Sequence, residues 1–392
     1  MFKIKLCGVL LFCCFTPLLA APYIPSSPMQ VLERLPTNSS LSSKTFKALR
    51  AQLNSRPNDV AIATQLAKLY IERSRIEGDP RYLGYAQAAL TPWWKMNEPP
   101  VDVLVLRATL LQSTHRFDQS LVDLDTVLKQ DPNNGQAWIT RATILQVQGK
   151  YVEAYKSCEH LYALAPNLVT LTCATNIHNL NGQAYKSYQK LKAGYAESGE
   201  TNPSIQVWVL TLLAEMATRV GDNEAAEQYF QKAMKIEEPD SYLLGAYSDY
   251  LLDQKRSPEV IQLLKNKTKI DALLLRYAEA LKNTSSGDAA LQIESLKQRF
   301  AAAMLRGDTV HQREQSRFEL RLMNNPINAM QIAKQNWEIQ KEPADARVYL
   351  EAATASKDNV AIQTMMRWLA SSHLEDANLT KIISNTKSAL SI

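Results

Sequence analysis

The sequence predicts an all-α fold in which antiparallel helix pairs stack into a solenoid. The main observation is a repeat with a step of 34 residues. Its landmarks return from one unit to the next: Leu104, Ala108, Leu111, Phe117 and Pro132 recur as Trp138, Ala142, Leu145, Tyr151 and Pro166. A composition of 46% hydrophobic and 21% charged residues, with only 12 glycines, is typical of an ordered, helix-rich chain. One such unit cannot bury its apolar face alone, so the copies are expected to stack.

The first twenty residues form a different kind of segment. Lys3 and Lys5 precede an apolar run that ends at Leu19, and the small residue Ala20 follows. This order predicts a secretory signal peptide over residues 1–20. An uncleaved membrane anchor is an alternative, but the run is shorter than the roughly 20 residues that a spanning helix needs. A lipid-modified cysteine is another alternative, although Phe12 stands where a small residue would be expected.

The charge of the remaining chain is nearly balanced. Without Lys3 and Lys5 it has 42 basic and 39 acidic side chains, a formal net charge of +3. This balance gives no electrostatic reason to expect nucleic acid as a partner. After residue 20 no stretch is long and apolar enough to cross a bilayer, so we expect no stable membrane insertion once the signal peptide is removed.

The repeats are expected to follow a short lead-in. Residues 21–43 contain four prolines among serines, which favours an extended segment. Residues 44–240 are expected to carry the repeats, with the clearest units at 101–134, 135–168 and 207–240. The stop between the first two clear units is predicted at Asp131–Asn134, where proline ends one helix and asparagine caps the next. A degenerate unit with a four-residue insertion separates the second clear unit from the third.

After residue 240 the repeat signal weakens. Apolar stripes with helical spacing continue, and Ala333, Trp337 and Pro343 restore the pattern of a second helix that ends in proline. We therefore predict degenerate helical repeats and a cap over residues 241–388. The total is about nine helix pairs and a capping helix near residues 379–388.

At Trp138, Ala142, Gly149, Ala154 and Pro166 the sequence resembles the tetratricopeptide repeat (TPR) family. The resemblance implies a right-handed superhelix. More narrowly, the chain is similar to secreted bacterial TPR proteins of uncharacterised function, which implies a periplasmic location. It also implies a non-catalytic scaffold that binds a protein or peptide and assists the assembly or organisation of an envelope complex.

In that family, ligands lie along the first helix of each unit, at its second, fifth, ninth and twelfth positions. The resemblance therefore implies a binding groove that includes Thr109, Gln112, Gln136, Thr143, Gln146, Trp208, Thr211 and Glu215. This groove is mostly neutral and lacks the family's basic clamp for a carboxylate terminus. An extended or helical segment held by amide hydrogen bonds and apolar pockets is the expected ligand.

The two cysteines outside residues 1–20 are Cys158 and Cys173. They fall on helices that pack against each other in a TPR stack, and an even number of cysteines in an oxidising compartment favours a disulfide. Two separate buried thiols are the alternative. A metal site with His160 and His178 is disfavoured, because Cys158 and His160 point to different faces of a helix.

No catalytic motif accompanies the repeats, so we expect neither an enzyme nor a cofactor or metal. Asp123 and Asp125 are two residues apart on a helix and point apart, and we expect both to be solvated. An α-helical envelope hydrolase and a metal-handling accessory protein are the alternative functions.

Overall fold

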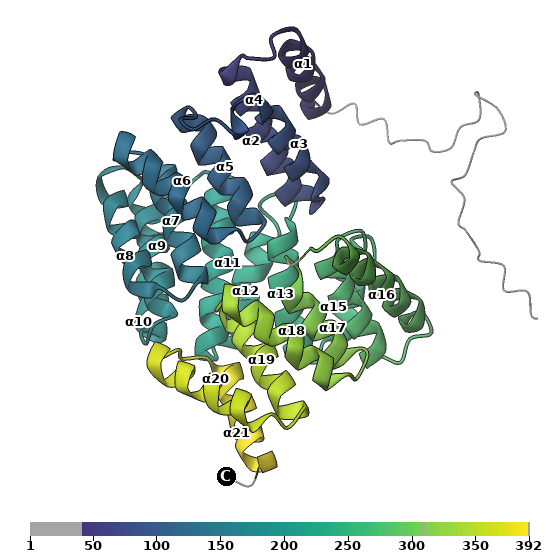
Figure 1. Cartoon of the computed structure of the whole chain (residues 1–392). Coiled ribbons are helices and arrows are strands. Elements are labelled where there is room, and N and C mark those ends of the chain that lie inside the picture. The colour runs from purple at the N-terminus through teal and green to yellow at the C-terminus, as the bar shows by residue number, and fades with distance from the viewer. Residues whose placement is uncertain (1–40, 309, 391–392) are drawn as a thin grey trace, which may run out of the picture. The chain divides into compact units, whose positions relative to one another are not determined.

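The structure, a computed structural model, describes residues 41–308 and 310–390. The predicted signal peptide and residues 21–40 of the predicted lead-in lie outside the described residues. Within the described part, 21 α-helices and one short 3-10 helix form the secondary structure, without a strand (Figure 1). The chain divides into residues 1–47 and residues 48–392, and helix α1 (Leu41–Ser55) crosses this boundary. The helix pairs all lie in the second unit.

Nine helix pairs follow one another, which confirms the predicted solenoid. In order they are α2 (Val60–Glu77) with α3 (Arg81–Ala89), α5 (Val101–Ser113) with α6 (Phe117–Gln130), α7 (Gly135–Val147) with α8 (Tyr151–Glu159), α9 (Asn167–Asn179) with α10 (Ala184–Glu197), α11 (Pro203–Val220) with α12 (Asn223–Ala233), α13 (Ser241–Asp253) with α14 (Ser257–Leu264), α15 (Asp271–Asn283) with α16 (Ala289–Leu305), α17 (Gln312–Arg321) with α18 (Pro326–Ile339), and α19 (Pro343–Ala355) with α20 (Asn359–Ser372). The remaining elements are α4 (Thr91–Trp94), the 3-10 helix η1 (His160–Ala163) and the terminal helix α21 (Ala377–Leu390). None of the described helices is long and apolar enough to span a bilayer.

Local sequence signals start and stop these helices. At the predicted stop between α6 and α7, the Asn134 side chain accepts a hydrogen bond of 3.0 Å from the backbone N–H of Ala137. This bond satisfies one of the amides that a helix start leaves unpaired. Inside a pair, Gly149 and Gly182 adopt φ values of 73° and 75°, which glycine reaches without steric cost. The chain therefore reverses direction within a few residues.

Small and large apolar side chains alternate where the helices meet. Ala142 and Ala154 are buried in one apolar cluster with Leu145 and Tyr151. The two alanines let the helices approach, and the larger side chains fill the space between them. Trp93 on α4 is buried as well, where α4 packs between α3 and α5.

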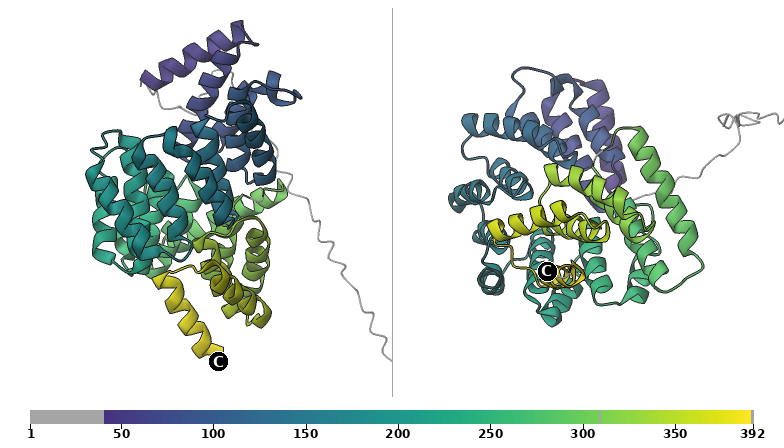
Figure 2. Two further views of the ribbon diagram at one scale, coloured as in Figure 1. Left: turned by 90° about the vertical axis from the view of Figure 1, so that its left-hand side faces the viewer. Right: turned by 60° about the horizontal axis from the view of Figure 1, so that its bottom comes forward.

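The end of the solenoid packs against its beginning. The right-hand view of Figure 2 shows the last helices, coloured yellow, crossing the middle of the arc that the earlier pairs form. Residues 340–377, which we call the closing segment, meet four successive turns between the two helices of a pair. Gln340 lies 3.2 Å from the His115 ring, the Lys341 N–H donates to Val147 O at 2.7 Å beside Gly149, and Glu375 accepts from the Ala184 N–H at 2.9 Å beside Gly182. At the fourth turn, a Cβ on Gly221 would lie 3.9 Å from Ala377.

We predict that Gly182→Ala weakens this closure. A Cβ at position 182 would lie 3.0 Å from the Cβ of His373, and the positive φ adds a backbone cost of about 1–2 kcal/mol. Gly199→Ala is the matched control, because Gly199 also has a positive φ (58°) but no atom within 4 Å of its would-be Cβ. In urea denaturation, Gly182→Ala should lose more stability than Gly199→Ala. Hydrogen exchange in residues 359–377 should also increase only for Gly182→Ala, and equal behaviour of the two variants would contradict the contact.

Candidate functional site on the first helices of the pairs

The predicted groove residues all lie on first helices, namely α5, α7 and α11, but their exposure differs. Thr109 and Thr211 are buried, and each hydroxyl donates to a carbonyl of its own helix, at 3.0 and 2.7 Å. Gln136 and Thr143 on α7 are exposed. Gln146 accepts a hydrogen bond of 3.0 Å from Asn176 on α9. The half-buried side chains of this set are Gln112, Gln146, Trp208 and Glu215. The accessible polar surface of α7 is therefore centred on Gln136 and Thr143.

Tyr242 on α13 extends the predicted groove by one pair. The spacing that selects Trp208 and Glu215 also selects Tyr242 and Asp249 when it is carried across Pro239, a step that the sequence analysis missed. Tyr242 is 58% exposed, and its hydroxyl donates to Glu215 Oε1 at 2.9 Å. The pair joins neighbouring first helices, so the tyrosine ring is held in place while its surface stays open.

The charges around Glu215 and Tyr242 come from three elements. Burial raises the pKa of Glu215, while Arg219 and the Tyr242 hydroxyl act in the opposite direction. Burial, Glu215 and Glu342 together raise the pKa of Tyr242 well above its usual value. An exposed ring with so strongly shifted a pKa borders a space flanked by α11, α13 and the start of α19, rather than bulk solvent.

A chain of ion pairs continues from this space across four first helices. Asp249 on α13 accepts from Arg276 on α15 and from Arg317 on α17, at 2.5 and 2.7 Å. Further pairs are Arg317 with Glu279, Arg321 with Glu279 and Glu351, and Arg347 with Glu351 and Asp253. Burial by itself would raise the pKa of Asp249, but Arg276 and Arg317 outweigh it and hold that pKa well below its usual range. These carboxylates are fixed, charged parts of the surface.

Helix α17 and Asp123 show where sequence patterns mislead. The buried side of α17 includes Gln312, Glu314, Gln315, Ser316 and Arg317, so no apolar stripe announces it. The expectation of a solvated Asp123 was wrong. Asp123 is 6% exposed and receives two hydrogen bonds of 2.7 Å from Arg107, which lies on the neighbouring helix α5. The partner of a buried carboxylate depends on helix packing, which spacing along one helix does not reveal.

His115 gives the charged region a pH dependence. Burial, followed by the charge of Arg313, lowers its pKa to about 4, while Glu314 and Glu342 oppose the shift and His311 adds to it. Neutral His115 is thus favoured in the folded state. Its contribution to stability is present above the unfolded pKa of about 6.5 and is lost as the pH falls toward 4.

We predict that His115→Asn removes this pH dependence. Asparagine tolerates the positive φ of 55° at this turn. Between pH 7 and pH 4 the wild-type protein should lose about 2 kcal/mol more unfolding free energy than the variant, allowing for solvent screening. Asp345, whose pKa burial raises to about 6, has the opposite effect but is common to both proteins. Parallel stability curves from urea denaturation would contradict the prediction.

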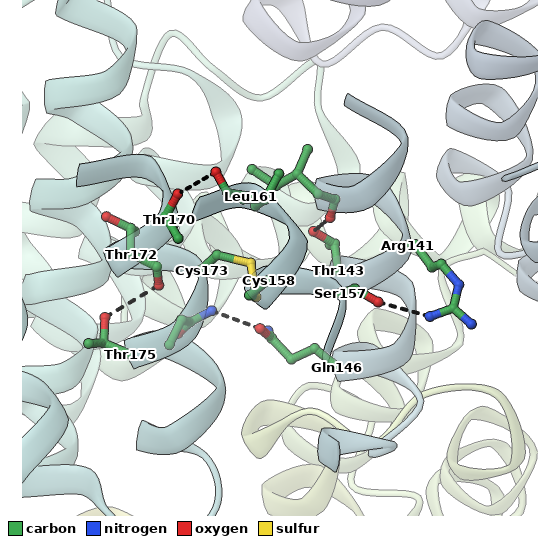
Figure 3. Close-up of a disulfide and its surroundings, with 12 residues drawn as sticks. Arg141, Thr143, Gln146, Ser157, Cys158, Leu161, Thr170, Thr172, Cys173 and Thr175 are labelled. Atoms are coloured by element: carbon green, nitrogen blue, oxygen red, sulfur yellow. Dashed lines mark hydrogen bonds between the residues drawn. A yellow bond between two sulfur atoms is a disulfide. The ribbon is translucent and has the colours of Figure 1, made fainter. Parts of the chain in front are cut away.

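Cys158 on α8 and Cys173 on α9 are joined in the structure, with their Cα atoms 5.7 Å apart (Figure 3). Oxidation of this pair in the cell stays a prediction. The two histidines of the disfavoured metal site have other contacts. His160 stacks on Trp138 with ring centroids 3.8 Å apart, and His178 lies 4.4 Å from the Tyr155 ring. Among the described residues no group of three or more His, Cys, Asp and Glu side chains has an arrangement that could hold a metal ion.

The architecture of the molecule is now defined. Nine helix pairs occur in succession, the clear units repeat at 34 residues, and left-handed residues form the turns within several pairs. The chain is a TPR-like α-solenoid. No protein-family model matches this TPR-like chain, and no curated protein sequence matches it.

Several solved structures are similar to the TPR-like chain. A tetratricopeptide repeat protein from Parabacteroides merdae ATCC 43184 shares 16% identity over 65% of this chain and 91% of its own, with a TM-score of 0.40. A monomeric mutant of IFIT1 with Gppp-AAAA shares 13% identity over 88% and 85% of the two chains, with a TM-score of 0.41. In the APC/C hetero-tetramer Cut9-Hcn1, the match covers 79% of this chain and 52% of the other at 14% identity, with a TM-score of 0.38.

Proposed function

We propose that this chain is a non-catalytic protein- or peptide-binding scaffold of the bacterial cell envelope that assists the assembly or organisation of an envelope complex. The observation that carries the proposal is Tyr242, an exposed aromatic ring fixed by Glu215 on a surface of first helices. Rigid aromatic side chains with a polar tip bind protein partners at low conformational cost. Exposed Gln136 and Thr143 add amide and hydroxyl groups on α7.

Two further observations support this function. Most of the acidic side chains near Tyr242 are engaged with arginines, which favours a binding surface over a hydrolase in which a carboxylate must exchange protons with its substrate. The predicted signal peptide and the Cys158–Cys173 pair support export to an oxidising compartment, the periplasm. The near-balanced charge favours a protein partner over nucleic acid.

Site-specific photocrosslinking in the native envelope tests the proposal. A photoreactive phenylalanine replaces Tyr242 in one variant and Tyr185 in the control, because Tyr185 on α10 is similarly exposed at 65%. A specific protein adduct at position 242 that is absent at position 185 is the expected result. Thr143→Lys, on the same groove, should reduce that adduct.

Three outcomes would contradict the proposal. Equal adducts at both positions would show that the surface around Tyr242 is not selective. Crosslinks to RNA rather than protein would assign a different class of partner. Recovery of the chain from the cytoplasmic fraction with residues 1–20 intact would remove the envelope location.

A further inference from the structure

A surface hollow of about 400 Å³ lies between α6, α7 and α8, away from the groove residues. Its lining residues are Asp125, Leu128, Lys129, Trp138, Arg141, Lys156, Ser157 and His160. Lys129 and Lys156 are exposed and form no ion pair with a described residue. The ring carbons of Trp138 and the side chain of Leu128 supply apolar surface. The hollow therefore combines apolar surface with an excess of positive charge.

The preceding repeat shows what this arrangement lacks. Arg107 occupies the same repeat position as Arg141, 34 residues earlier, and receives its counter-charge from Asp123 through two bonds of 2.7 Å. The residue 34 positions after Asp123 is Ser157, which carries no charge. The geometry of one repeat thus records a carboxylate that the next repeat does not provide.

Arg141 is only partly compensated by its other neighbours. It donates to the Ser157 hydroxyl at 2.8 Å and to Asp125 at 3.1 Å, and Figure 3 shows the contact with Ser157. The Asp125 side chain is 53% exposed, so solvent screens this ion pair. The Nη2 group of Arg141 has no partner among the described residues. A guanidinium of this kind binds a carboxylate through two parallel hydrogen bonds.

We propose that this hollow is a docking site for an acidic segment of a partner protein. A carboxylate of the segment takes the place at Arg141 that Asp123 takes at Arg107, Lys129 and Lys156 attract the flanking negative charge, and an adjacent apolar side chain lies on Leu128 and Trp138. The proposal deepens the proposed function, on which it rests, by naming the chemistry of a partner. Asp125 in the lining disfavours a phosphate backbone.

Fluorescence polarisation with a defined probe tests the site in the full chain. The probe is a fluorescein-labelled synthetic peptide in which two glutamates flank a leucine, and the matched peptide has glutamines instead. The glutamate peptide should bind at least tenfold more tightly than the glutamine peptide. Arg141→Gln should weaken its binding at least tenfold, whereas Lys186→Gln, an exposed lysine on α10, should leave it unchanged.

Ser157→Asp provides a second test, because it supplies the missing carboxylate within the chain. This variant should stay folded, as judged by its far-UV circular dichroism and melting temperature, and bind the peptide at least tenfold more weakly. Unchanged binding by folded Ser157→Asp would overturn the proposal, as would equal binding of the two peptides. Tighter binding of a single-stranded RNA oligonucleotide would assign the hollow to nucleic acid. If the Tyr242 adduct persists while peptide binding fails, the scaffold function stands and the acidic docking site is wrong.

Discussion

Replacing Glu279 by alanine should lower the unfolding free energy by about 3–5 kcal/mol, because it leaves a buried positive charge without its counter-charge. Glu279 is 5% exposed and Arg317 is 9% exposed, and two hydrogen bonds of 2.6 and 2.9 Å join them. Burial alone would raise the pKa of Glu279, but Arg317 and Arg321 outweigh it and keep the carboxylate charged. Urea denaturation followed by circular dichroism measures the loss.

Two further variants separate this effect from a general effect of removing a carboxylate. In Glu238→Ala the lost partner is Lys267, in an ion pair whose glutamate side chain is 72% exposed, so the loss should stay below about 0.5 kcal/mol. Glu279→Gln should be less harmful than Glu279→Ala, since the amide oxygen still accepts a hydrogen bond from Arg317. Similar losses in Glu279→Ala and Glu238→Ala would show that the buried network contributes no more than a surface pair.

Removing the Cys158–Cys173 link should cost about 3 kcal/mol, the value expected in the chain-entropy model for a loop of about this size. The two residues are 15 positions apart, and both side chains are buried between α8 and α9. The double variant Cys158→Ala/Cys173→Ala should unfold at a lower urea concentration than the oxidised wild-type protein. A reductant should lower the stability of the wild-type protein by a similar amount.

The alanine variant is its own control for the reductant, which should not change its stability. Alkylation without reductant followed by intact-mass measurement reports the state of the native protein. Two alkylated thiols in protein purified from the envelope would reject the disulfide. Unchanged wild-type stability in reductant would show that the link contributes little.

Much of the fold could be predicted because one step of the sequence determines one step of the structure. Gly149 and the Asp131–Asn134 stop mark local conformations that depend on a few neighbouring residues. The same logic located the late pair around Ala333 and Trp337, where a small residue and an aromatic residue share one face of α18. Such signals survive even where the complete repeat pattern has faded.

The parts that could not be predicted depend on residues far apart in the sequence. Helix α17 buries Arg317 against partners on α13 and α15, so its sequence appears polar although the helix is packed. The approach of Gln340 to His115 depends on small rotations accumulated over many pairs. Tyr242 belonged to the predicted spacing, but its fixed and exposed position required knowledge of how Glu215 is oriented.

The closing segment changes how the molecule is expected to unfold. An open solenoid behaves as a row of units that each depend only on their neighbours, so its ends can melt separately. Here the Gln340 contact spans 225 residues and the Glu375 contact spans 191. Opening α5 or α9 therefore also removes contacts of α19 and α20, and the terminal pairs share one cooperative transition with pairs near the start. Closing such long loops is also slow relative to forming neighbouring helix pairs, which places the docking of the closing segment late in folding.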